Sequence, residues 1–203
     1  MYQEFARFLE LPGRATFIAA RAAWLQQKVS PLTPEELQSV AQLLAAGEAT
    51  AVIEQVHSWK SRAAFSPRAH YFCGEAHALL GELEQAEVER LAFSACLQGI
   101  LATGDGSRLK PYIISQIPDE YDVLKLLGLT CQKQRLVQRG RRSCDVLTCQ
   151  DGSSVWFNIS DLLTLPAAET KSPAIERVQI ERATTGFIRT KRRPSGRLRA
   201  SPR

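Results

Sequence analysis

Two helix-start signals lie 33 residues apart, and this spacing constrains the fold of the first half of the chain more than any other feature. Thr33 and Ser66 each precede a proline, the residue favoured at the first position of a helix. Glu36 completes a predicted capping box with Thr33. Gly47 and Gly81 follow 14 or 15 residues after these starts, where a helix would end. A period near 34 residues with paired helices is typical of tetratricopeptide repeats.

Apolar residues at three-and-four spacing predict a mainly helical body over residues 1–102. In its second unit Gly74, Gly81 and Ala86 have the spacing of the small residues that let tetratricopeptide helices approach closely. Glu89 and Arg90, however, stand where that family has bulky apolar groups. We therefore expect a degenerate helical repeat, the alternative being an unrelated bundle of five or six helices. The helices are expected at about residues 2–10, 15–27, 34–46, 52–59, 67–80 and 84–100.

The pattern changes after Thr103, where the sequence predicts a small β-rich module. A short strand is expected at Tyr112–Ile114, and a helix begins at Asp119, where acidic residues favour the first turn. Asp151-Gly152 is a strong signal for a two-residue hairpin. The overall prediction is an α+β fold with a helical body over 1–102, a β-α-β-β-β module over 103–165 that packs on this body, and a basic, disordered tail over 166–203. The last three strands are expected at 131–138, 143–149 and 154–159.

The positive charge of the chain is concentrated in its tail. The whole sequence has a net charge of +5, yet residues 166–203 hold ten Lys and Arg against three Asp and Glu. The preceding residues are therefore close to neutral or slightly acidic. The high isoelectric point describes the tail rather than the folded surface.

The motifs of the module resemble those of an uncharacterised bacterial family built on a domain of unknown function. The similarity rests on TGDGSRLKPYIIS, then DEYDVLKLLGL, then DVLTCQDGSSVWFNISDLL, and it covers about residues 95–163. Several members of that family carry tetratricopeptide-like helices upstream. The resemblance implies this architecture and a bacterial setting, and it supplies no reaction and no catalytic residue.

Composition indicates a soluble, cytoplasmic chain that does not enter a membrane. The first residues lack a basic segment followed by an apolar run, and Arg21 interrupts the most apolar stretch. Five cysteines are an odd number with no C-x-x-C pair, which favours reduced thiols in a reducing compartment.

No catalytic motif is present, and we expect no enzyme activity, no cofactor, no metal and no small-molecule ligand. The chain lacks a phosphate-binding loop, a nucleophile elbow and a zinc-protease helix. His70, Cys73 and His77 share one face of a predicted helix, but the same positions suit helix packing better than metal binding. The acidic residues of the module are each explained by a turn, a helix start or a hairpin, although paired carboxylates could also serve as acid and base. They are Asp105, Asp119, Glu120, Asp122, Asp151 and Asp161.

Two groups of basic residues are candidates for contact with nucleic acid. One lies on the predicted hairpin, near Trp156 or Tyr112, and no acidic residue falls between 130 and 142. Its alternative is a solvated edge strand that charge protects from pairing. The hairpin group is Lys133, Arg135, Arg139, Arg141 and Arg142; the tail group is Arg189, Lys191, Arg192, Arg193, Arg197 and Arg199.

These observations favour a non-enzymatic protein that binds another protein through its helical pairs, as repeat proteins do. The alternative is a nucleic-acid-associated protein that uses the basic tail and the 133–142 hairpin. The sequence does not identify the partner in either case.

Overall fold

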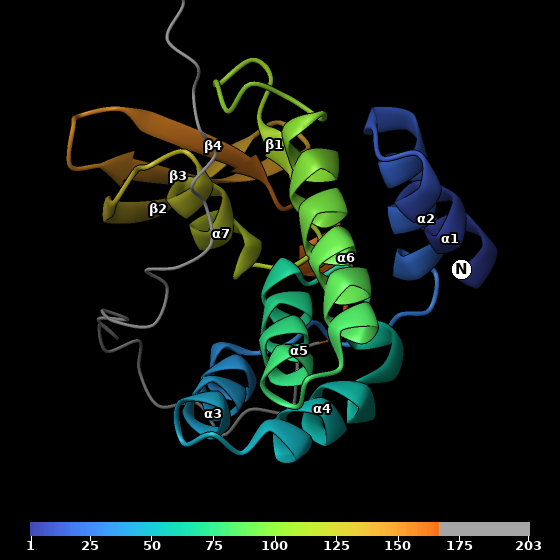
Figure 1. Ribbon diagram of the computed structural model, residues 1–203. Coiled ribbons are helices and arrows are strands. Elements are labelled where there is room, and N and C mark those ends of the chain that lie inside the picture. The colour runs from blue at the N-terminus through green and yellow to red at the C-terminus, as the bar shows by residue number, and fades with distance from the viewer. Residues whose placement is uncertain (167–203) are drawn as a thin grey trace, which may run out of the picture. The chain divides into compact units, whose positions relative to one another are not determined.

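The computed structural model describes residues 1–166 and confirms the α+β fold (Figure 1). The expected disorder of the tail, and its basic residues, fall outside the described residues. Within residues 1–166 seven α-helices accompany one four-stranded sheet, and the module has the predicted β-α-β-β-β order. The helices are α1 (Tyr2–Glu10), α2 (Arg14–Leu25), α3 (Pro34–Ala45), α4 (Ala49–Ser58), α5 (Pro67–Leu79), α6 (Leu83–Leu101) and α7 (Asp119–Leu126). The strands are β1 (Tyr112–Ile113), β2 (Cys131–Arg139), β3 (Arg142–Cys149) and β4 (Ser154–Asn158).

The helix starts and ends confirm the signals in the sequence. The Thr33 hydroxyl accepts the backbone N–H of Glu36 at 3.2 Å, and the Glu36 carboxylate accepts that of Thr33 at 2.8 Å. Ser66 caps α5 in the same way by accepting from Ala69. Gly47 and Gly81 adopt φ of +79° and +78°, a backbone conformation that costs other residues energy. Local chemistry therefore defines the two helical pairs α3–α4 and α5–α6.

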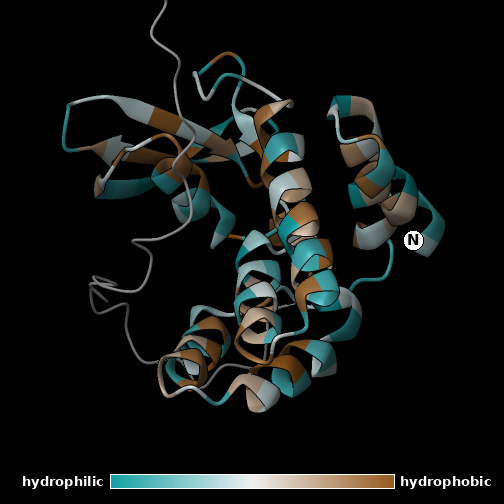
Figure 2. Ribbon diagram, viewed as in Figure 1, coloured by the Kyte–Doolittle hydropathy of each residue, from teal (hydrophilic) through white to brown (hydrophobic). Residues whose placement is uncertain are grey.

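The helices bury their apolar faces in two separate clusters. α5 packs against α3, α4 and α6, and the first cluster lies among α3, α4 and α5, with Leu37, Val52 and Phe72 as members. The second cluster joins α1, α2 and α6 to α7 and the sheet. Figure 2 shows apolar and polar residues interspersed along the helices, as expected when each helix buries only one face. No helix within residues 1–166 is both long and apolar enough to cross a bilayer.

The sheet has the strand order β1-β4-β3-β2, with β1 parallel to β4 and the other neighbours antiparallel. Its inner face, which carries Leu147, Val155 and Phe157, contributes to the second cluster. Residues paired across strands point to the same face, so Arg135, Val146 and Trp156 form one row on the opposite, outer face. A turn that contains Asp151-Gly152 joins β3 to β4, but the Cys149 N–H donates to the Ser153 carbonyl at 2.8 Å, so the loop comprises residues 150–152 and is one residue longer than predicted.

Buried polar side chains tie the module to the helices. The Arg21 guanidinium on α2 donates to the Ile114 carbonyl and to Asp161, both at 2.8 Å. The Gln116 side chain accepts from the Leu32 N–H at 3.0 Å and donates to the Arg62 carbonyl at 2.8 Å. These bonds and the shared core show that the module packs on the helices, as its small size predicts.

Candidate functional site

The outer face of the sheet carries exposed basic side chains on β2 and one tryptophan on β4. Lys133, Arg135 and Arg139 alternate along β2 and are exposed, and the pairing of strands places Arg135 in the same row as Trp156 of β4. Adjacent strands are separated by about 4.8 Å, so the Arg135 and Trp156 backbones lie about 10 Å apart with Val146 between them. Tyr112 belongs to the inner face, where its ring contacts Phe157. Of the two aromatic residues suggested by the sequence, Trp156 is therefore the one beside the basic group.

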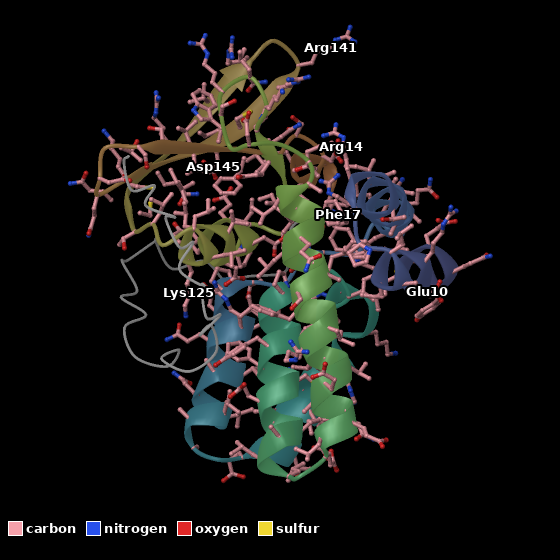
Figure 3. The ribbon with its side chains drawn as sticks, turned by 45° about the horizontal axis from the view of Figure 1, so that its top comes forward. Glu10, Arg14, Phe17, Lys125, Arg141 and Asp145 are labelled. Carbon is pink, nitrogen blue, oxygen red and sulfur yellow. The ribbon has the colours of Figure 1, made fainter. Side chains whose placement is uncertain are left out.

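A pocket of about 580 Å³ lies at the end of this face, between the β2–β3 turn and the loop that precedes β1. Arg139, Arg141 and Arg142 line it from the turn, and Arg108 lines it from the loop. In Figure 3 Arg141 stands at the tip of the hairpin and points away from the helices. None of the ion pairs found within residues 1–166 uses these four arginines. Four guanidinium groups around one open pocket attract anions, phosphate above all.

The pocket brings together three of the five predicted hairpin residues, Arg139, Arg141 and Arg142, whereas Lys133 and Arg135 lie further along β2. It also adds Arg108, which the sequence did not indicate. Arg108 lies 25 residues before Lys133 in the sequence, in a loop whose placement depends on the fold. The Asp105 carboxylate accepts the Ser107 N–H at 2.9 Å and so shapes this loop. The candidate residues of the tail, Arg189 to Arg199, lie outside the described residues.

On the inner face of the sheet, the side-chain amide of Gln134 donates hydrogen bonds to two carboxyl groups, those of Glu120 on α7 and Asp145 on β3. Gln134 of β2 donates to Glu120 at 3.1 Å and to Asp145 at 2.7 Å, and it accepts the Tyr121 hydroxyl at 2.6 Å. Burial, followed by the negative charges of Asp145 and Asp119, raises the pKa of Glu120 to about 9. Glu120 therefore stays protonated at neutral pH and adds no second negative charge beside Asp145. Figure 3 shows Asp145 on the side of the sheet that faces α7.

Two further acids lie on α7, of which Asp119 is buried and Asp122 half-buried. Asp119 accepts the backbone N–H groups of Ser115 and Gln116 at 3.0 and 2.9 Å, yet burial raises its pKa well above the usual range. Asp122 forms an ion pair with Arg68 at 2.7 Å. These contacts fix α7 against α5 and the loop before it. The arginine-lined pocket lies on the opposite face of the sheet, so the carboxyl groups and the pocket form separate sites.

A third group of side chains joins the helical pairs. His57 of α4, Cys73 and His77 of α5 and Glu89 of α6 bring one potential ligand atom each to within 4.8 Å of all the others. Burial, then the charge of Glu89 and a hydrogen bond to it, raise the pKa of the Cys73 thiol to about 12. Burial opposes ionisation of Glu89, but a hydrogen bond from His70 and the charges of His70, His77 and His57 outweigh it and lower its pKa.

The sequence analysis grouped Cys73 and His77 with His70, and the structure gives His70 a different role. His70 bonds Glu89 at 2.6 Å through Nδ1 and the Ala64 carbonyl at 3.0 Å through Nε2. Both of its ring nitrogens are thus engaged, and it orients Glu89. His57 and Glu89 belong to neighbouring helices, so helical spacing along one segment could not reveal them.

Exposed apolar side chains gather where α5 turns into α6. Residues 79–91 hold five of the thirteen large hydrophobic side chains that are exposed within residues 1–166. They surround the turn at Gly81 and the first turns of α6. Scattered exposed apolar residues need no explanation, whereas a local group is typical of a contact surface. The group is Leu79, Leu80, Leu83, Val88 and Leu91.

Comparison with families shows that the model of a domain of unknown function, DUF4919, matches residues 28–166. The matched region begins before α3 and ends after β4, so it includes the helical pairs and the module together. Comparison with curated proteins and with solved structures found no match.

Proposed function

Given that the chain belongs to the DUF4919 family through residues 28–166, we propose that it is a non-enzymatic protein that binds single-stranded nucleic acid on the outer face of its sheet. The observation that carries this proposal is the row of Arg135, Val146 and Trp156, which continues into the arginine-lined pocket. Basic side chains hold phosphates, and an aromatic ring between them stacks on a base. From the sequence alone, binding of nucleic acid was the alternative and binding of another protein the favoured function.

Two features of the geometry support a single strand rather than a duplex. The base-stacking candidate, Trp156, is half-buried on β4, Arg135 lies in the same cross-strand row, and Arg141 stands at the hairpin tip (Figure 3). Unpaired bases can turn towards such a ring, whereas stacked bases in a duplex cannot. The tail supplies further charge, and the full chain would combine both groups.

The test measures binding of the full chain to a fluorescent uridine or thymidine oligonucleotide by anisotropy over a series of salt concentrations. We expect Arg135→Gln to weaken binding. The slope of the logarithm of affinity against the logarithm of salt concentration should also fall by about one, the value for one lost phosphate contact. Arg7→Gln removes one exposed charge from α1 and is the matched control, with unchanged binding. Trp156→Ala should weaken binding about 5- to 150-fold, the range that corresponds to loss of one stacked base.

A variant of the full chain with glutamine at the tail positions separates the two basic groups. Changes at Arg189, Lys191, Arg192, Arg193, Arg197 and Arg199 should lower affinity without removing the effect of Trp156→Ala. If Trp156→Ala and Arg135→Gln bind as the wild type does, the sheet is not the binding surface and the proposal is wrong.

A second candidate function, binding of a protein partner, rests on the apolar group at residues 79–91. α3–α4 and α5–α6 would then act as a tetratricopeptide-like array that presents its last helix to the partner. A pull-down from the native host, after nuclease treatment, should recover a partner with the wild type and lose it with Val88→Asp. Leu11→Asp, at another exposed leucine, should retain it. Equal recovery with Val88→Asp would exclude this surface.

We further propose that the protein works in the cytoplasm of a bacterial cell. All five cysteines are free thiols, which suits a reducing compartment.

A further inference from the structure

We propose that His57, Cys73, His77 and Glu89 form a structural Zn²⁺ site that fastens α4 and α6 to α5. Nitrogen, sulfur and carboxylate oxygen are the ligands that Zn²⁺ prefers, and four of them complete a tetrahedral shell. With four protein ligands no position remains for a substrate, so the site is structural rather than catalytic. This inference is independent of the proposed binding of nucleic acid.

The distances suit a site that contracts slightly around the ion. Zinc bonds of 2.0–2.3 Å place tetrahedral ligand atoms about 3.3–3.8 Å apart, and the four atoms here already lie within 4.8 Å of one another. Cys73 and His77 are four residues apart on α5, so the helix itself keeps them on one face. His57 is exposed at the end of α4 and can turn towards them.

Two ligands are oriented by neighbours in the manner of metal sites. His77 Nδ1 bonds Glu82 Oε2 at 2.6 Å, which leaves His77 Nε2 to face the other ligand atoms. His70 holds Glu89 at 2.6 Å. A carboxylate behind a ligating histidine fixes the ring and increases its basicity, and such partners contribute 10- to 100-fold to affinity.

A glycine on α5, Gly74, allows α5 and α6 to pack closely beside the four potential ligands. A Cβ atom on Gly74 would lie 3.3 Å from the Glu89 Cβ and 3.5 Å from the Ala86 carbonyl oxygen. Glycine at this position lets α6 come close enough for Glu89 to reach Cys73. A larger residue at position 74 would therefore push Glu89 away from the other three potential ligands.

Charge balance favours a divalent ion at this place. A thiolate from Cys73 and the carboxylate of Glu89 would neutralise Zn²⁺, so the half-buried site would carry no net charge. The mixture of imidazole and thiolate favours zinc over magnesium or calcium, which take oxygen ligands. Since α4 packs mainly on α5, the ion would add a direct link between α4 and α6.

The first experiment measures the metal content of the untagged full chain by mass spectrometry and titrates the metal-free protein with Co²⁺. We expect about one zinc per chain, and with Co²⁺ both the visible bands of tetrahedral coordination and a thiolate charge-transfer band. Cys73→Ser should abolish the charge-transfer band, whereas Cys131→Ser, at another thiol, should retain it. A wild type whose Co²⁺ spectrum equals that of Cys73→Ser would overturn the proposal.

Further variants separate ligation from folding. His57→Gln should weaken zinc binding at least tenfold with unchanged circular dichroism, because His57 is exposed; Glu54→Gln on the same helix is its control. Glu82→Gln should weaken binding 10- to 100-fold without changing the stoichiometry. Zinc should slow hydrogen exchange in α4 and leave β3 unchanged. Equal exchange of α4 with and without zinc, or equal affinity of His57→Gln and the wild type, would contradict the site.

Discussion

The two faces of the sheet differ in the ionisable side chains that they carry. On the inner face Glu120 and Asp145 share the Gln134 amide, and Glu120 is neutral because burial raises its pKa to about 9. On the outer face Lys133 and Arg135 are exposed, and Arg135 shares a cross-strand row with Trp156. Both faces belong to the same three strands, so alternation along each strand separates a buried, largely neutral surface from a charged one.

The difference shows which of the two faces can bind a partner. The apolar side chains of the inner face, among them Leu147, Val155 and Phe157, are already packed in the second cluster with α6 and α7. The outer face keeps positive charges that no ion pair within residues 1–166 neutralises, next to an aromatic ring. A surface of this kind gains most from a polyanion, because binding releases counterions without breaking existing pairs.

Adjacent aromatic residues on β4 give the strongest test of this contrast. Phe157 is fully buried on the inner face, and Trp156 is half-buried on the outer face. We expect Phe157→Ala to lower the free energy of unfolding by about 3–5 kcal/mol, the cost of a large cavity. Trp156→Ala should cost less than half as much, measured by urea denaturation of the full chain.

The same pair of variants should give the reverse order in the binding assay. Trp156→Ala is expected to lose affinity for the oligonucleotide at temperatures where both proteins are folded. If Phe157→Ala and Trp156→Ala lowered the free energy of unfolding equally, the outer face would be a second core face. The two faces would then not differ as described.

The sequence predicted the fold well wherever local chemistry decides it. The caps at Thr33 and Ser66 act within a few residues, and both are confirmed. A turn does form at Asp151-Gly152, but its loop has three residues, 150–152, instead of the predicted two. The strand expected at 154–159 also formed, as β4 over Ser154–Asn158. The strand order β1-β4-β3-β2 was not predicted, because it depends on contacts between distant segments.

Candidate sites were predictable only in part, for the same reason. The five basic residues of the hairpin lie within ten positions of one another, and their charge pattern revealed them. Arg108 joins them through a loop, and His57 and Glu89 meet Cys73 across three helices. Helical periodicity compares residues of one helix, so it grouped His70 with Cys73 and overlooked the partners on α4 and α6.

A more specific effect should appear in the pH dependence of stability. The pKa of Glu120 is about 9 in the folded chain, against an ordinary value of 4.5. Between these values the folded state holds a proton that the unfolded state has lost, so this group's contribution to stability falls as pH rises. The slope is at most about 1.4 kcal/mol per pH unit.

Glu120→Gln removes this proton equilibrium and keeps an oxygen that can accept from Gln134. We expect the variant to gain stability relative to the wild type as pH rises from about 5, with the gain levelling off near pH 9. Chemical denaturation at several pH values measures it, and Glu54→Gln, at an exposed carboxylate, should show no such trend. A difference between Glu120→Gln and the wild type that stays constant with pH would mean that Glu120 is charged in the folded state. The inner face would then bury two charges, and the contrast with the outer face would lose its basis.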